Sequence, residues 1–450
     1  MTCHGEKPLS LIIRSVHRAT GIETASTRDG KAAMARGMND TDPAGFGSRR
    51  SALRLLDAVM RRGQPLETAL NAATQDLSNP ADRAFAHAIA SETLRRLPDL
   101  DDLIDGATQQ RLPDDSKARM VLRLALVQAL ILETPHHAVV ATALPLVDGG
   151  PRRLVHGVLG ALLRQGAALR TVPMLPPAVE ARWQAAWGQA MVDGACLSLS
   201  VPPAMDLTLR DPATTEAWVA ALEGESLAPG HVRIKRNQSV TDLPGYGEGA
   251  WWVQNLSASV PARLLGTGSG RTVLDLCAAP GGKTMQLAAA GWDVIAVDSQ
   301  ARRLERVRDN LDRTQLEAQL IEADVLKWEP AAPVDAILLD APCTATGIFA
   351  RHPDVLHRVR PRDIAALALT QARLLTRASQ WLKPGGTLIF ATCSLEPEEG
   401  ENVAQAADLK RFPVETRELP AGLIAASEGW VRIQPRHNMD GFFIARFTTS

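Results

Sequence analysis

The sequence predicts a doubly wound, mostly parallel α/β domain preceded by an all-α domain. After residue 270, short runs rich in β-branched residues alternate with helix-length segments, which is typical of parallel strands joined by helical crossovers. Residues 48–170 instead follow the spacing of buried helix faces. The chain of 450 residues is also too long for one ordinary hydrophobic core.

The first 170 residues divide into a leader and a helical domain. Residues 1–47 lack hydrophobic periodicity, and we expect a disordered leader there. Within 48–170, "SALRLLDAVM" (51–60) places apolar residues on one helix face. "MVLRLALVQALIL" (120–132) is apolar nearly all round, as in the central helix of a bundle, and "RRLVHGVLGALLRQ" (152–165) predicts a further helix. The segment is mildly basic, which permits RNA binding but equally fits ordinary solvated arginines.

The rest of the chain divides into a connector and the α/β domain. Residues 171–250 are rich in proline at both ends, and we interpret them as a connector with a small α/β insertion. Residues 251–450 form the α/β domain, with strands expected at "TVLDL" (272–276), "DVIAV" (293–297), "VDAILL" (334–339) and "TLIFAT" (387–392). Ligands of such sheets bind beyond the carboxyl ends of the strands, where the chemically interesting residues of this half lie.

Composition excludes several classes of protein. The cysteines are scattered without a C-x-x-C pair, so structural zinc or a disulfide scaffold is not expected, and we predict no metal. No apolar run reaches the ~20 residues that span a bilayer, and there is no signal peptide, so we predict a cytoplasmic protein without a membrane partner. The net charge of -1 neither favours nor excludes nucleic acid. Local basic segments are "HVRIKRNQ" (231–238) and "RHPDVLHRVRPR" (351–362).

A glycine turn follows the first predicted strand. In "DLCAAPGGKT" (275–284), Gly281 and Gly282 lead into a helix, whose N-terminus favours negative charge. A P-loop needs glycine where Cys277 stands, and the dinucleotide pattern G-x-G-x-x-G fails as well. The remaining common ligand is S-adenosylmethionine. Asp298 follows the second strand, where an acid takes ribose hydroxyls, and Asp324 follows the third, in position for the adenine.

Two thiols stand at two strand ends. Cys343 follows Asp340 and Pro342, and Cys393 follows "TLIFAT". Cytosine C5 is a poor nucleophile, but a thiolate that adds to C6 converts the ring to an enamine, and C5 can then accept a methyl group. An acid near N3 would stabilise charge on the ring, and Asp340 is so placed. A single cysteine is more often a small buried hydrophobe; two beside a cofactor loop favour catalysis.

These motifs resemble those of a known family. "DLCAAPGGKT", "LLDAPCTATG", "RHPD" and "ATCSLEPEEGEN" look like the signature of the RNA cytosine-5 methyltransferases, and of their bacterial 16S ribosomal RNA branch of the RsmB/Sun type. The helical half resembles the NusB-like RNA-binding domain of that branch. The resemblance implies a Rossmann-like catalytic domain, methyl transfer to C5 of a cytosine in 16S ribosomal RNA, and a monomer.

The resemblance also implies roles for individual residues. Cys393 is the expected nucleophile and Cys343 assists product release, with Asp340 and Lys283 completing the catalytic set. The expected cofactor-binding residues are Cys277, Ala278, Ala279, Pro280, Gly281, Gly282, Lys283, Asp298, Asp324 and Asp340.

One departure and two alternatives stay open. In "WWVQNLSAS" (251–259), Asn255 stands where the family usually has Asp, so an electrostatic role there is in doubt; Trp251 and Trp252 are expected to pack, although they could stack on a base. An exocyclic-amine nucleic-acid methyltransferase would need no thiol. The second alternative is an RNA chaperone that binds S-adenosylmethionine without catalysis.

Overall fold

The computed structural model describes residues 43–235, 239–435 and 438–449. The chain forms two compact units: a helical unit, Met1–Pro176 with His352–Arg358, and an α/β unit, Pro177–Arg351 with Val359–Ser450. Residues 1–42, most of the predicted leader, lie outside the described residues.

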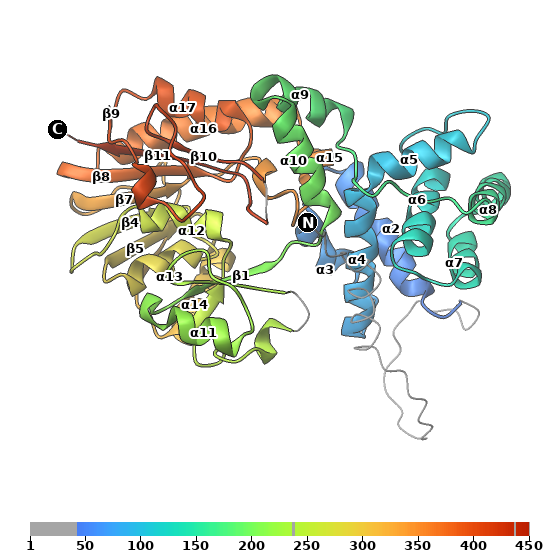
Figure 1. The fold of residues 1–450 in the computed structure, drawn as a ribbon, viewed down its shortest axis with the longest axis horizontal. Helices are drawn as coiled ribbons and strands as arrows, with labels where there is room; N and C mark the ends of the chain where they lie inside the picture. The colour runs from blue at the N-terminus through green and yellow to red at the C-terminus, as the bar shows by residue number, and fades with distance from the viewer. Residues whose placement is uncertain (1–42, 236–238, 436–437, 450) are drawn as a thin grey trace, which may run out of the picture. The chain divides into compact units, whose positions relative to one another are not determined.

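The helical unit is built around one buried helix (Figure 1). Every residue of α6 (Lys117–Leu130) from Ala118 to Gln128 is buried, which confirms the central helix predicted from "MVLRLALVQALIL". Its neighbours in the unit are α2 (Phe46–Met60), α3 (Leu66–Ala73), α4 (Pro80–Arg95), α5 (Leu97–Gly106), α7 (His136–Ala143), α8 (Gly149–Arg164) and the short α15 (Val355–Arg358). Two arginines of α6 are buried because they are paired: Arg123 contacts Asp101 with two bonds of 2.8 Å, and Arg119 pairs with Asp101 and Asp105.

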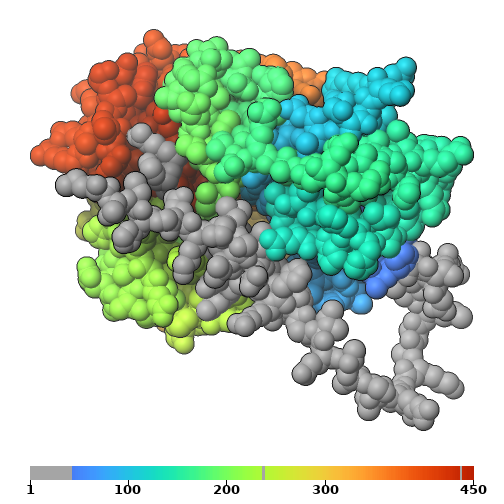
Figure 2. All heavy atoms as spheres, turned by 45° about the vertical axis from the view of Figure 1, so that its right-hand side comes forward, coloured from blue at the N-terminus to red at the C-terminus, as the bar shows by residue number. Residues whose placement is uncertain are grey.

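Other arginines of the helical unit face solvent. The surface formed by the later helices of this unit is seen in Figure 2. Arg152 and Arg153, in the first turns of α8, are exposed. They are therefore available to a phosphate backbone.

The α/β unit begins with two helices and a small sheet. After α9 (Pro177–Trp187) and α10 (Gln189–Ser200), strand β1 (Met205–Leu209) pairs antiparallel with β2 (His231–Ile234) and β3 (Trp251–Val253), and α11 (Thr215–Ala221) lies between β1 and β2 in the chain. The connector thus contains the predicted α/β insertion, but its third strand comes from residues beyond 250.

The main sheet has the order β10-β11-β8-β7-β4-β5-β6, with β9 paired to β11 (Figure 1). Strands β4 (Thr272–Leu276), β5 (Asp293–Asp298), β6 (Gln319–Glu322), β7 (Val334–Asp340) and β8 (Leu382–Thr392) are parallel; β9 (Lys410–Arg411), β10 (Val431–Ile433) and β11 (Phe442–Thr448) form the antiparallel edge. All four strands predicted from β-branched runs are present, which confirms the doubly wound fold.

Alternate residues of the central strands supply two cores. Leu274 and Leu339 pack with α16 (Pro361–Ser379) and α17 (Glu401–Ala406). Val273 and Leu338 pack on the other side with α12 (Leu256–Arg263) and α13 (Gly282–Ala289). This period of two explains why both faces of the strands read as continuous apolar runs. Helix α14 (Ala301–Thr314) packs in a third cluster with Trp252 and Met285.

Candidate active site

The predicted cofactor loop turns sharply between β4 and α13. Cys277 and Gly281 have positive φ angles of 62° and 98°. A β-carbon at Gly281 would lie 2.9 Å from Val307 of α14, so only glycine fits both the backbone and the space. The loop is tied to β5 by the bond of 3.1 Å from the Ala278 N–H to the Val297 carbonyl. Burial raises the pKa of the Cys277 thiol to about 12, so this third thiol is a poor nucleophile.

Asp298 holds the same loop from the end of β5. Its buried carboxylate accepts the Ala279 N–H at 3.2 Å and the Gln300 N–H at 3.1 Å. Arg303 of α14 lies 3.4 Å from this carboxylate and donates to the Ala279 carbonyl. Asp324 follows Ala323, whose N–H donates to the Asp298 carbonyl at 3.0 Å. The half-exposed Asp324 carboxylate accepts the Leu326 N–H at 3.0 Å and lies 3.6 Å from the Lys327 ammonium.

A lysine and two acids lie at the carboxyl ends of β4 and β7. The ammonium of Lys283 is 2.7 Å from the Asp340 carboxylate. Burial alone would lower the pKa of Lys283, but Asp340, with smaller effects of Asp275 and Cys393, raises it above its ordinary value. Asp275 is fully buried, which raises its pKa to about 7 although Thr284 donates to it at 2.6 Å. A cavity of about 330 Å³ adjoins Lys283 and Asp340 and is walled by the cofactor loop and residues 252–254.

The two predicted thiols meet. Strands β7 and β8 are parallel neighbours with Asp340 opposite Ala391, so the segments that follow them come together. The sulfurs of Cys343 and Cys393 are 3.4 Å apart, and both residues are half-buried. The bond to Cys393, burial and the charges of Cys393 and Glu399 raise the pKa of Cys343 well above its ordinary value. Cys343 therefore keeps its proton near neutral pH and can donate it to the Cys393 sulfur.

The loop after Cys343 is closed from behind by the last strand of the sheet. The Gly347 N–H donates to the Cys393 carbonyl at 2.8 Å, and the Gly441 N–H donates to the Gly347 carbonyl at 2.8 Å. A β-carbon at Gly347 would lie 2.1 Å from the Gly441 carbonyl oxygen. The two backbones approach so closely that neither a side chain nor water fits between them.

Comparisons with known proteins agree with this geometry. The family model "16S rRNA methyltransferase RsmB/F" matches residues 262–448, and the NusB family model matches residues 47–165. The ribosomal RNA small subunit methyltransferase B of Xanthomonas campestris pv. campestris is 34% identical over 427 residues, 90% of this chain and 98% of that protein. The protein of the same name from Klebsiella pneumoniae (strain 342) is 35% identical over 421 residues, 88% of this chain and 96% of that protein. The chain belongs to the RsmB/F family of 16S rRNA methyltransferases.

Solved structures support the fold of this RsmB/F family member. A methyltransferase homolog protein from Pyrococcus horikoshii is 28% identical with a TM-score of 0.52, over 65% of this chain and 98% of that one. The protein PH0851 shares the fold with a TM-score of 0.67 at 23% identity, over 88% of this chain and 98% of that one. Family membership makes the protein an rRNA methyltransferase that depends on S-adenosylmethionine, and it confirms the predicted resemblance, helical NusB half and Rossmann-like fold.

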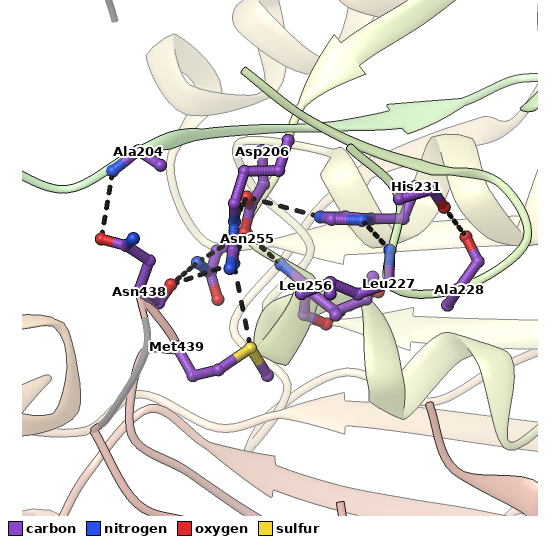
Figure 3. Close-up of polar contacts among 12 residues, drawn as sticks. Ala204, Asp206, Leu227, Ala228, His231, Asn255, Leu256, Asn438 and Met439 are labelled. Carbon is purple, nitrogen blue, oxygen red and sulfur yellow. Dashed lines mark hydrogen bonds and ion pairs between the residues drawn. The ribbon is translucent and has the colours of Figure 1, made fainter. Parts of the chain in front are cut away.

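Asn255, the residue that departs from the usual family sequence, belongs to a buried polar cluster (Figure 3). Its side-chain oxygen accepts the Ser257 N–H at 2.9 Å and caps α12, while its amide donates to Asp206 at 2.9 Å. Desolvation would raise the pKa of Asp206, but His231 and Arg233 outweigh it and lower the pKa to about 2. An acid at position 255 would therefore face a carboxylate that is always charged.

Several arginines of the two basic segments form ion pairs within the protein. Arg233 pairs with Asp206 at 2.7 Å, and residues 236–238 lie outside the described residues. In the second segment Arg351 pairs with Asp440 and Arg358 with Asp354, which leaves Arg360 and Arg362 exposed. The sequence alone did not show that buried carboxylates, some near in the chain (Asp354) and some distant (Asp440), neutralise these arginines.

Two site residues escaped sequence reasoning. Arg303 follows Asp298 by about one helical turn and a half, a spacing that could have suggested contact with the loop. Glu399, in "EPEEGEN", sits among other acids, and nothing in the sequence shows that it is buried, as Glu396 is too. Trp251 and Trp252 are both buried, which confirms packing.

Within the described residues, no group of three or more His, Cys, Asp or Glu side chains could hold a metal. No helix there is long and apolar enough to cross a membrane.

Proposed function

We propose that this enzyme transfers a methyl group from S-adenosylmethionine to C5 of a cytosine in 16S ribosomal RNA through a covalent bond between Cys393 and C6. The observation that carries the proposal is the pair of sulfurs 3.4 Å apart, at the ends of neighbouring strands and beside the Lys283–Asp340 pair. An enzyme that methylates an exocyclic amine would have no use for this pair, because the amine supplies its own electron pair.

The positions of the side chains support each step of the proposed mechanism. The thiolate of Cys393 bonds to C6, and the electrons of the C5–C6 double bond move toward C5 and the ring oxygen and nitrogen. The charge of Cys393 is one of the effects that raise the pKa of Lys283, so the two groups interact. The Lys283 ammonium is therefore the positive group available to stabilise the negative charge that develops on the ring. S-adenosylmethionine supplies the methyl group to C5. Loss of the C5 proton to a base restores the double bond as the Cys393–C6 bond breaks.

Cys343 serves the last step in this proposal. Because the pKa of Cys343 is raised, Cys343 is the sulfur of the pair that keeps its proton while Cys393 attacks. When the Cys393 sulfur leaves C6, the neighbouring S–H hydrogen bond stabilises the departing thiolate. The proposed division of labour is therefore Cys393 for attack and Cys343 for release.

The residues around the cofactor loop fit S-adenosylmethionine. Asp298, a buried acid at the end of β5, is proposed to hold the ribose, and Asp324 the adenine. The backbone from Cys277 to Lys283, with Gly281 in its strained turn, is proposed to line the methionine end. The helical unit, with exposed Arg152 and Arg153, is proposed to bind the RNA backbone, and the enzyme to act as a cytoplasmic monomer.

Methyl transfer to a 16S rRNA transcript tests the proposal directly. Cys393→Ala should abolish transfer with S-adenosylmethionine affinity within twofold of the parent, and Cys196→Ala, on helix α10, serves as the control thiol. Cys343→Ala should accumulate an RNA–protein adduct that survives denaturing gels. Mass spectrometry of nucleosides should find 5-methylcytidine. Substantial transfer by Cys393→Ala, or an N-methylated nucleoside as product, would overturn the mechanism.

A further inference from the structure

One buried carboxylate links the residues that follow the two thiols. Glu399 is fully buried, five residues beyond Ser394. Its Oε1 accepts the Thr344 N–H at 2.9 Å, and its Oε2 accepts the Ser394 hydroxyl at 2.6 Å and the Thr344 hydroxyl. Thr344 follows Cys343 directly, and Ser394 follows Cys393. A single side chain therefore spans both thiol-bearing segments.

Burying the Glu399 carboxylate costs desolvation free energy, which its hydrogen-bond donors must offset. Burial raises the pKa of Glu399, and hydrogen bonds from Ser394 and Thr344 oppose that effect. Gln371 of α16 adds a donor to Glu399 at 3.2 Å and also donates to the Pro342 carbonyl at 2.9 Å. The carboxylate is thus held by neutral donors: Thr344 follows Cys343, Ser394 follows Cys393, and Gln371 contacts the residue before Cys343.

Other hydrogen bonds also join the two thiol-bearing segments, among them the bond of 2.8 Å from the Gly347 N–H to the Cys393 carbonyl. The Thr346 hydroxyl lies 3.2 Å from that of Ser394 and accepts the Leu395 N–H at 3.0 Å. These bonds fix the chain after the thiols. The bonds of Glu399 fix the residue next to each sulfur.

We propose that Glu399 is a positioning residue that holds Cys343 and Cys393 as a pair, so that one sulfur attacks the ring while the other keeps its proton for release. The proposal rests on the proposed function, because it assigns the pair the roles of attack and release. The negative charge of Glu399 supports it independently, since that charge contributes to raising the pKa of Cys343.

Two substitutions separate the reach of Glu399 from its charge. Glu399→Gln keeps the length and removes the charge, whereas Glu399→Asp keeps the charge and shortens the side chain by one methylene. The matched control is Glu398→Gln, at the exposed neighbouring acid. With 16S rRNA, the measurements are kcat and S-adenosylmethionine affinity. Without RNA, the alkylation of Cys343 by iodoacetamide is followed as a function of pH. Peptide mass spectrometry distinguishes alkylated Cys343 from the other thiols.

Both variants should lower kcat at least about tenfold, because misplaced reacting groups lose rate steeply, with S-adenosylmethionine affinity within twofold of the parent. Glu399→Gln should also move the alkylation profile of Cys343 to lower pH, and Glu399→Asp should leave it in place. Parent-like kcat in both variants would overturn the proposal. So would equal losses of kcat and cofactor affinity with an unmoved profile in Glu399→Gln, since these indicate a merely structural role. If Glu399→Gln does not fold, the kcat of Glu399→Asp decides. Failure of the proposed function is recognised separately, by methyl transfer in Cys393→Ala.

Discussion

Replacing Asn255 by Asp tests the charge balance of the cluster around Asp206. The change puts a carboxylate oxygen where the Asn255 amide now lies 2.9 Å from the Asp206 carboxylate, whose pKa of about 2 keeps it charged. Two like charges about 4 Å apart repel by about 4 kcal/mol at an effective dielectric constant of about 20. The new acid can escape this repulsion by binding a proton, which at pH 7 costs about 4 kcal/mol for an ordinary carboxyl with a pKa of about 3.9.

The two limits agree, and Arg233 with the partial exposure of residue 255 reduces the repulsion. We expect Asn255→Asp to lower the free energy of unfolding of the α/β unit by about 3 kcal/mol at pH 7. The pKa of the new acid is raised in the folded state, so the loss is largest at high pH and shrinks as pH falls. At pH 5, proton uptake limits it to about 1.5 kcal/mol.

Urea unfolding followed by tryptophan fluorescence measures the effect, because the buried Trp251 and Trp252 lie next to the cluster. Asn255→Ala is the control: it loses the cap and one hydrogen bond, at a cost of about 1–2 kcal/mol that should not change between pH 5 and 7. The double variant Asp206→Asn/Asn255→Asp should recover stability, since Arg233 then faces one carboxylate again. Parent-like stability of Asn255→Asp at pH 7, or a loss that is the same at pH 5, would refute the reasoning.

Three further outcomes are expected. Asp298→Ala should weaken S-adenosylmethionine binding at least about tenfold by calorimetry, because the Ala279 N–H loses its acceptor, while RNA binding and the control Asp293→Ala stay at the parent level. Lys283→Met should reduce kcat by roughly 100-fold in methyl transfer, since the charge near the ring is lost; a change in KM alone would contradict this role. Burial lowers the pKa of His357 in α15 to about 4 against 6.5 unfolded. The folded helical unit should therefore lose up to about 2 kcal/mol of stability as pH falls from 7 to 5, moderated by the partial exposure of the ring; His357→Gln should flatten this dependence in thermal unfolding.

The sequence was most informative where one strand or helix determines a structure. The apolar run of β7 predicted its strand because both faces of the sheet are covered, and "APGG" predicted a tight turn because only glycine fits at Gly281. The meeting of Cys343 and Cys393 followed from strand order, since neighbouring parallel strands end at the same edge.

Pairing between distant residues could not be predicted. Asp206 and Asn255 are 49 residues apart, and the sequence alone suggested only a lost charge at Asn255, not an amide required by a carboxylate opposite. Arg351 belongs to a segment that is basic in the sequence, and its pairing with Asp440, 89 residues away, could not be foreseen. The roles of Asp324, Asp298 and the thiols stay predictions until tested as above.

The contact between Gly347 and Gly441 has a consequence for biosynthesis. A ribosome makes the Cys343 segment about a hundred residues before Gly441 and β11, the parts that brace it. A nascent chain that has emerged only as far as Cys393, the residue after β8, already carries both thiols, yet lacks the backbone that seals them. The enzyme should therefore acquire its chemistry only once the final strand inserts.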